Sequence, residues 1–183
     1  MDDGEAQQRW VFGYGSLMWR PGFAYLERRA ALHHGRRRAF CIYSVHHRGT
    51  PQRKGLVLGL APGGAVRGMA YRVAEADWPS TYAYLMEREQ PTETYVEHYA
   101  AARLDDGRLV RALTFLSDRS HPQWAGVLSL EAQADLIAGA RGLSGRNVDY
   151  LIDLVEHLRA EGVCDPNMER LLVLVEAREQ AAA

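Results

Sequence analysis

The stretch VFGYGSLMW, residues 11–19, determines how the start of this chain is interpreted. Its apolar beginning is typical of a short buried strand. We predict this strand over Arg9–Gly15, with glycine at its end. Gly13 and Gly15 bracket a tyrosine, and a serine follows at once. Either these glycines only form a tight turn, or the loop offers backbone N–H groups to an anion such as a carboxylate. The pattern alone leaves both interpretations open.

Two common motifs do not fit this stretch. A dinucleotide-binding loop needs a third glycine, and Met18 stands in its place. A serine-hydrolase elbow needs glycine two residues before and after the serine, whereas Ser16 has Tyr14 and Met18 there. No phosphate-binding lysine follows. Phosphate binding and serine nucleophilic chemistry are therefore both disfavoured.

Strand signals fill the first two thirds of the chain. Two of them flank Ala61–Ala65 and two flank Asp105–Gly107, and both junctions predict hairpins. Beyond the opening strand, the predicted strands cover residues 39–45, 55–60, 66–73, 95–104 and 108–116.

Helix signals dominate the rest. The predicted helices cover Glu75–Glu89, a segment capped by Ser129 and running to Gly142, Asn147–Gly162, and a last helix that begins at Asp165-Pro166. The last two carry apolar stripes: Val148, Leu151, Ile152, Val155 and Leu158, then Met168, Leu171, Leu172 and Val175. Strands followed by helices predict an α+β fold, a single-domain mixed β-barrel with surrounding helices. We expect a polar lead over residues 1–8, one domain over 9–179 and a frayed end over 180–183.

Composition excludes several classes of protein. With 183 residues and a formal net charge of −1, the chain lacks the basic character of a nucleic-acid-binding domain. Cys41 and Cys164 are far apart and belong to no metal-binding motif, so we expect no disulfide and a reducing compartment. The acidic, polar N-terminus is not a signal peptide, and no apolar run is long enough to cross a bilayer. These features predict a cytoplasmic protein that does not associate with membranes.

One glutamate is in line with a predicted buried stripe. Tyr82, Leu85 and Met86 have helical spacing, and Glu89 follows at the next position of the same face. Burial raises the pKa of a carboxyl group, which suits a general base working near neutral pH. The alternative is that the helix frays before Glu89 and leaves the carboxylate in water.

A cluster of arginines and a pair of histidines complete the candidates. Five arginines lie within Arg28–Arg38, and we expect most to be solvated, although Arg38 is a candidate cavity residue. His46 and His47 are adjacent and would point to opposite faces of a strand, so no metal site is expected. Arg48, in the same loop, is a candidate anion contact. A non-catalytic binding module that uses the basic region remains an alternative function.

Five segments together resemble the ChaC family of γ-glutamylcyclotransferases. They are VFGYGSLMWRPGF, HHRGTP, GMAYRV, LMERE and GLSGRNVDYL, in the order and spacing of that family, and the similarity extends from about Trp10 to Val175. The resemblance implies a compact mixed α/β barrel with helices. It also implies an enzyme that converts glutathione to 5-oxoproline and cysteinylglycine without a metal or an organic cofactor.

The resemblance also assigns site residues. Glu89 matches the catalytic glutamate of the family, and Tyr95 and Tyr150 resemble tyrosines that line the pocket. The loop that binds the γ-glutamyl group corresponds to Gly13, Tyr14, Gly15, Ser16, Leu17 and Met18. We therefore expect glutathione as the substrate, with other γ-glutamyl amino acids or γ-glutamylamines as the alternative, and a monomer or weak dimer.

The implied reaction needs no protein nucleophile. The α-amine of the substrate attacks its own γ-amide carbonyl, and one carboxylate can take the amine proton and return it to the departing nitrogen. The absence of a Ser-His-Asp or metal motif is consistent with this chemistry.

Overall fold

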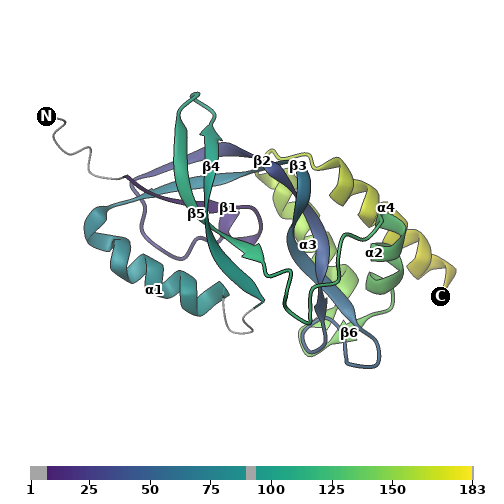
Figure 1. The fold of residues 1–183 in the computed structure, drawn as a ribbon. Helices are drawn as coiled ribbons and strands as arrows, with labels where there is room; N and C mark the ends of the chain where they lie inside the picture. Colours follow the sequence, from purple (N-terminus) through teal and green to yellow (C-terminus); the bar gives the residue numbers. More distant parts are fainter. Residues whose placement is uncertain (1–7, 90–93, 183) are drawn as a thin grey trace, which may run out of the picture. The chain divides into compact units, whose positions relative to one another are not determined.

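The computed structural model describes residues 8–89 and 94–182, and its strands precede most of its helices (Figure 1). The main strands are β1 (Arg9–Gly13), β2 (Glu27–Ser44), β3 (Gly55–Val73), β4 (Tyr95–Leu104) and β5 (Leu109–Ser117). The short strands β6 (Arg141–Gly142) and β7 (Gly145–Arg146) pair with each other. The helices are α1 (Trp78–Glu89), α2 (Leu130–Ile137), α3 (Asn147–Ala160) and α4 (Pro166–Ala181), with the 3₁₀ turns η1 (Ser16–Met18) and η2 (Glu75–Asp77).

The five main strands form a closed barrel in the order β1-β3-β2-β4-β5. β1 runs antiparallel to β3, with Val11 opposite Tyr71, and parallel to β5, with Val11 opposite Leu113. The sheet is therefore mixed. The predicted α+β class with a mixed barrel and helices is confirmed.

The chain divides into two compact units. The first comprises the chain up to Arg36 together with Gly63–Leu116, and the second comprises Arg37–Pro62 together with the chain from Ser117 onward. The long strands β2 and β3 contribute residues to both. The expected single domain over residues 9–179 stays a prediction.

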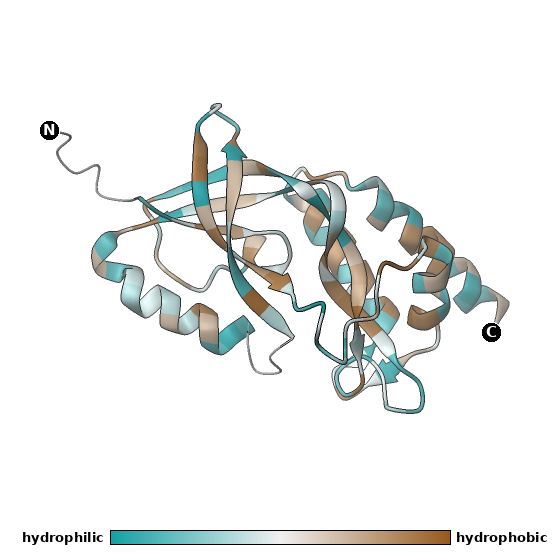
Figure 2. Cartoon of the chain, in the orientation of Figure 1, coloured by the Kyte–Doolittle hydropathy of each residue, from teal (hydrophilic) through white to brown (hydrophobic). Residues whose placement is uncertain are grey.

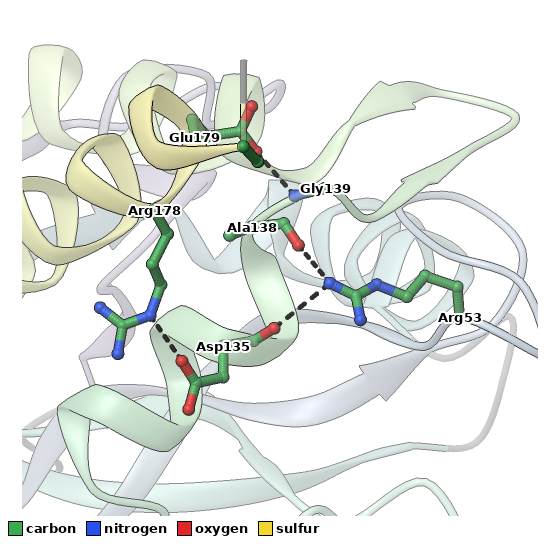
Figure 3. Close-up of a pocket in the computed structure, with 7 residues that line it drawn as sticks. Arg53, Asp135, Ala138, Gly139, Arg178 and Glu179 are labelled. Atoms are coloured by element: carbon green, nitrogen blue, oxygen red, sulfur yellow. Dashed lines mark hydrogen bonds and ion pairs between the residues drawn. The ribbon is translucent and has the colours of Figure 1, made fainter.

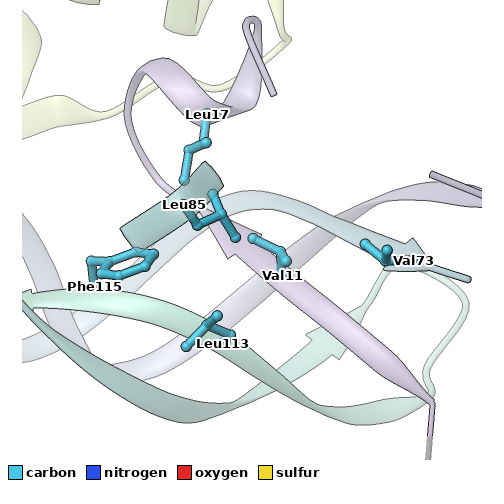
Figure 4. Close-up of a cluster of buried hydrophobic side chains, with 6 residues drawn as sticks. All are labelled: Val11, Leu17, Val73, Leu85, Leu113 and Phe115. Atoms are coloured by element: carbon cyan, nitrogen blue, oxygen red, sulfur yellow. The ribbon is translucent and has the colours of Figure 1, made fainter. Parts of the chain in front are cut away.

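The first unit has an apolar core beneath α1 (Figure 4). Leu85 of α1 is fully buried there, and Tyr82 and Met86 pack against the cluster, as the predicted stripe requires. The cluster consists of Val11, Leu17, Val73, Leu85, Leu113 and Phe115. Because these residues come from α1, η1 and three strands, the core fixes α1 and the glycine loop on the same strands.

The helices of the second unit confirm the predicted stripes and caps. Apolar and polar segments alternate along α3 and α4 (Figure 2). The Asp165 carboxylate accepts hydrogen bonds from the backbone N–H groups of Asn167 and Met168, and Ser129 accepts one from Ala132. These side chains satisfy N–H groups that a helix start leaves unpaired.

Asn147 joins α3 to β3 within the second unit. Its side chain is fully buried. The amide oxygen accepts from the Leu56 N–H at 2.7 Å, and the amide nitrogen donates to the Leu56 carbonyl at 2.8 Å. The side chain thus pairs with this backbone much as a neighbouring strand would.

The hairpin predicted at Ala61–Ala65 is wrong. β3 runs through this segment from Gly55 to Val73, with Gly63 and Gly64 at φ values of 87° and 74° inside it. The Arg37 guanidinium also donates to the Pro62 carbonyl. Glycines at these positions therefore permit a local left-handed conformation rather than a reversal of the chain.

Two predicted boundaries are also wrong, whereas the second hairpin is confirmed. The second strand begins at Glu27 instead of Ala39. The helix capped by Ser129 ends at Ile137, since Gly139 adopts a φ of 72°. β4 and β5 meet across Asp105–Gly107, where Gly107 has a φ of 91°.

No helix of the described residues is long and apolar enough to span a membrane. Both cysteines are free, as expected, with Cys164 exposed and Cys41 buried. The Cys41 thiol lies 3.9 Å from the Ser117 hydroxyl, and burial raises its pKa to about 12.

Candidate active site

The glycine loop follows β1 directly and turns into η1. Gly13 is needed for close packing, because a Cβ atom there would lie 2.7 Å from the Leu17 Cβ. Gly68 of β3 is equally restricted, since its Cβ would lie 2.2 Å from the Gly13 carbonyl oxygen. The loop therefore lies tightly against its own turn and against β3.

Contacts to the carbonyl groups hold this loop in place. The Tyr71 hydroxyl is 2.6 Å from the Met18 carbonyl and 3.0 Å from that of Leu17. The Arg28 guanidinium donates to the Met18 carbonyl at 3.2 Å, and the Tyr14 hydroxyl donates to the Phe115 carbonyl at 2.9 Å. Tyr71 and Arg28 of the barrel thus engage carbonyl groups of the loop, and Tyr14 of the loop engages a carbonyl group of β5.

The backbone N–H groups of the loop are less fully engaged than its carbonyl groups. The Met18 N–H donates to the Gly15 carbonyl at 2.9 Å, which closes the 3₁₀ turn. Within residues 8–89 and 94–182, the N–H groups of Gly15 and Ser16 meet no acceptor. Two adjacent N–H groups without a protein acceptor are suited to a carboxylate.

Glu89 is part of α1 and is mostly covered. Its side chain retains 20% of its exposure, so the helix does not leave it in open water. Burial raises the pKa of the Glu89 carboxyl above its ordinary value, and the positive charge of Arg88 offsets part of this effect. Such a carboxyl is suited to accepting and returning a proton near neutral pH.

Arg88 links the loop to Glu89, and the sequence pattern did not identify it. Its Nη2 donates to the Ser16 hydroxyl at 2.8 Å, and its Nε lies 3.3 Å from a Glu89 carboxylate oxygen. Its Nη1 donates to the Tyr84 hydroxyl at 2.8 Å and to the Arg20 carbonyl at 2.6 Å. The spacing between Tyr84 and Arg88, one helical turn, is the signal that points to this arginine.

Tyr95, the first residue of β4, belongs to the same unit. It is half-buried and packs against the apolar cluster beneath α1. The structure thus brings the glycine loop, Glu89 and Tyr95 onto one core.

The other candidates lie in the second unit. The Arg48 guanidinium stacks over the Tyr150 ring at 5.4 Å and donates to the Arg146 carbonyl at 3.1 Å. Arg38 is buried, and its Nη1 lies 3.2 Å from the Asp165 carboxylate that caps α4. Their contacts with a substrate stay predictions.

Most of the basic region is engaged within the protein. Arg28 lies over the Tyr71 ring at 5.9 Å, Arg29 forms an ion pair with Glu27 at 3.1 Å, and Arg37 and Arg38 have the partners given above. Arg28 and Arg29 are nevertheless exposed, and of the five arginines only Arg38 is buried. Among the described residues, no group of three metal-binding side chains occurs.

The second unit also contains a pocket of about 330 Å³ beside α2 and α4 (Figure 3). The Arg53 guanidinium donates to the Ala138 carbonyl at 2.6 Å, and Arg178 donates to the Asp135 carboxylate at 2.5 Å. The Glu179 carboxylate accepts from the Gly139 N–H at 2.6 Å. These contacts fasten the end of α2 to α4, so we assign the pocket a structural origin.

The family model described as ChaC-like protein matches residues 9–178. A glutathione-specific γ-glutamylcyclotransferase of Escherichia coli (strain K12) is 38% identical over 91% of this chain and 72% of the relative. Human glutathione-specific γ-glutamylcyclotransferase 1 is 33% identical over 96% of this chain and 81% of the relative.

A solved structure has the same fold. The crystal structure of a yeast γ-glutamyl cyclotransferase specific to glutathione superposes with a TM-score of 0.81. The superposition covers 96% of this chain and 98% of the other, at 23% sequence identity.

Proposed function

This chain belongs to the ChaC family, and we propose that it is a glutathione-specific γ-glutamylcyclotransferase. The observation that carries the proposal is the Gly13–Met18 loop, whose N–H groups at Gly15 and Ser16 have no acceptor in the described part of the chain. Arg88 joins this loop to the mostly covered carboxyl of Glu89. The named relatives, at 33–38% identity over most of the chain, support glutathione as the substrate.

In the proposed complex, the glycine loop binds the γ-glutamyl end of glutathione. The N–H groups of Gly15 and Ser16 and the Ser16 hydroxyl receive the α-carboxylate. Glu89 takes a proton from the neighbouring α-ammonium group. The freed amine attacks the γ-amide carbonyl carbon, which forms the ring C–N bond. The original amide C–N bond then breaks as Glu89 returns this proton to the departing cysteinyl nitrogen, and the second proton lost by the ring nitrogen passes through solvent to the released amine, which leaves as an ammonium group.

The energetics suit a single carboxyl group. A free α-amine has a pKa of about 8, so deprotonation near neutral pH costs on the order of 1–2 kcal/mol. Holding the glutamyl chain bent makes the attack intramolecular, and effective molarities of about 10⁵ M or more are reached by well-oriented groups. Positioning therefore supplies most of the acceleration, and proton transfer supplies the rest.

The remaining residues have secondary roles in this proposal. Tyr95 lines the site beside the apolar core, and Arg38, Arg48 and Tyr150 are proposed contacts for the rest of glutathione. We further propose a cytoplasmic protein, monomeric or weakly dimeric, that requires no cofactor. Two free cysteines and a thiol-bearing substrate support a reducing compartment.

Product analysis tests this proposal. The purified protein is incubated separately with glutathione and with γ-glutamyl-alanine, and 5-oxoproline and cysteinylglycine are quantified. We expect 5-oxoproline and cysteinylglycine from glutathione. The Glu89→Gln variant should lose at least about 10²-fold in turnover, because general acid–base catalysis contributes about 10²–10⁴-fold.

Glu87→Gln is the matched control, because Glu87 is an exposed glutamate of the same helix. It should retain wild-type turnover. Formation of 5-oxoproline from γ-glutamyl-alanine alone would contradict the substrate assignment. Wild-type turnover in Glu89→Gln would contradict the role of the base without contradicting the activity.

A further inference from the structure

The contacts of Arg88 add a polar connection between two parts of the site, the glycine loop and Glu89, which already share an apolar core. Its Nη2 reaches the Ser16 hydroxyl in the glycine loop, and its Nε reaches the Glu89 carboxylate on α1. The guanidinium is planar, so these two contacts fix each other's direction. A shift of either group would therefore be transmitted to the other.

The opposite edge of the guanidinium is held by the protein. Nη1 contacts the Tyr84 hydroxyl at 2.8 Å and the Arg20 carbonyl at 2.6 Å, and the Pro21 carbonyl is 3.3 Å away. Only 18% of the Arg88 side chain is exposed. With its donors engaged in this way, Arg88 is better suited to orienting other groups than to binding a substrate itself.

The contact to Ser16 has a directional consequence. Because Arg88 donates to the Ser16 oxygen, the hydroxyl hydrogen of Ser16 remains available to donate elsewhere. A charged donor also polarises the hydroxyl and strengthens the bond that it donates. The Ser16 hydroxyl can therefore donate its own hydrogen to a substrate oxygen while Arg88 holds its oxygen.

We propose that Arg88 is a positioning residue that holds the Ser16 hydroxyl and the Glu89 carboxylate in one arrangement. The inference rests on the proposed function and deepens it: the substrate carboxylate is received by Ser16, and the proton is taken by Glu89, in a geometry that one guanidinium sets.

The ionisation of Glu89 gives the inference a measurable signature. The positive charge of Arg88 lowers the pKa of the Glu89 carboxyl, whereas burial raises it. Three tyrosines also pack on this core, Tyr82, Tyr84 and Tyr95, and the Glu97 carboxylate accepts from the Tyr82 hydroxyl at 2.5 Å. Removing the charge of Arg88 should therefore move the Glu89 pKa upward.

The experiment compares Arg88→Gln and Arg88→Lys with the wild type. Carbon NMR follows the titration of the Glu89 carboxyl, and Glu89→Gln identifies its signal. In Arg88→Gln, we expect the Glu89 titration and the acid limb of kcat/KM to move together to higher pH. In Arg88→Lys, which keeps the charge but not the planar fork, the titration should stay closer to wild type while KM rises about tenfold, the effect of losing one hydrogen bond to a charged group.

Arg159→Gln is the control, because Arg159 forms an ion pair with Glu169 in the other unit. It should change neither the titration nor KM. An unchanged or lower Glu89 pKa in Arg88→Gln, or an unchanged KM in Arg88→Lys, would overturn the inference. If Arg88→Gln does not fold, the KM of Arg88→Lys tests the inference. If the wild-type protein shows no activity, the NMR titration of Glu89 tests it without kinetics.

Discussion

At the scale of single residues, Glu89 combines catalytic suitability with a cost in stability. Burial raises the pKa of its carboxyl in the folded chain. The folded state therefore binds the proton more readily than the unfolded state, so stability is highest below the unfolded pKa and decreases as pH rises through the folded pKa. Above the unfolded pKa, the raised pKa of the Glu89 carboxyl therefore lowers the stability of the fold.

Glu89→Gln should consequently be more stable than the wild type at neutral pH, although it loses turnover. The advantage should shrink as pH falls toward the ordinary glutamate pKa of about 4.3, where the wild-type carboxyl is protonated as well. Thermal unfolding across this pH range measures the difference. Glu87→Gln, on the exposed side of α1, should show no such pH-dependent gain, and an equal gain there would contradict the assignment to burial.

The sequence predicted part of this site. The apolar spacing of α1 placed Glu89 on the inward side, and the glycine loop was found from its composition. Arg88 was missed because the spacing of apolar residues describes one helix and carries no information about its contacts with distant segments. The partners of Arg88 lie in the glycine loop and at Arg20, more than sixty residues earlier in the chain, and only the folded structure brings them together.

At the scale of elements, Asn147 illustrates how a side chain can replace strand pairing. Asn147→Ala would leave the N–H and carbonyl groups of Leu56 without their partner. A buried group left unsatisfied costs about 1–3 kcal/mol, so we expect a loss of about 2–5 kcal/mol in unfolding free energy. Denaturant unfolding measures this loss.

Asn167→Ala provides the matched control, because Asn167 is exposed on the first turn of α4. Its substitution should change stability by less than about 0.5 kcal/mol. Equal losses of unfolding free energy in Asn147→Ala and Asn167→Ala would show that the hydrogen bonds to Leu56 do not stabilise the fold.

Local signals predicted some elements better than others. The Asp165 and Ser129 caps and the Asp105–Gly107 turn were predicted correctly, because side-chain and glycine geometry act there within a few residues. The glycines at Gly63 and Gly64 were misinterpreted as a turn. Whether such a pair reverses a chain or continues a strand depends on distant contacts, and here Arg37 binds the Pro62 carbonyl.

At the scale of the whole molecule, the proposed reaction depends on positioning and one carboxyl group. Dialysis against a metal chelator should therefore leave 5-oxoproline formation from glutathione unchanged. Assay before and after chelation, with added divalent ions as a third arm, measures this. A loss that returns on adding one ion would show that the described residues do not account for the chemistry.

Cys41 lies in the β2 strand, and burial raises its pKa to about 12, so its thiol is protonated near neutral pH. Thiol–disulfide exchange requires a thiolate that a disulfide can reach. An enzyme that consumes glutathione works in contact with glutathione disulfide whenever the pool becomes oxidised. We therefore expect the buried Cys41 thiol to react slowly with that disulfide and the exposed Cys164 to be the more accessible thiol.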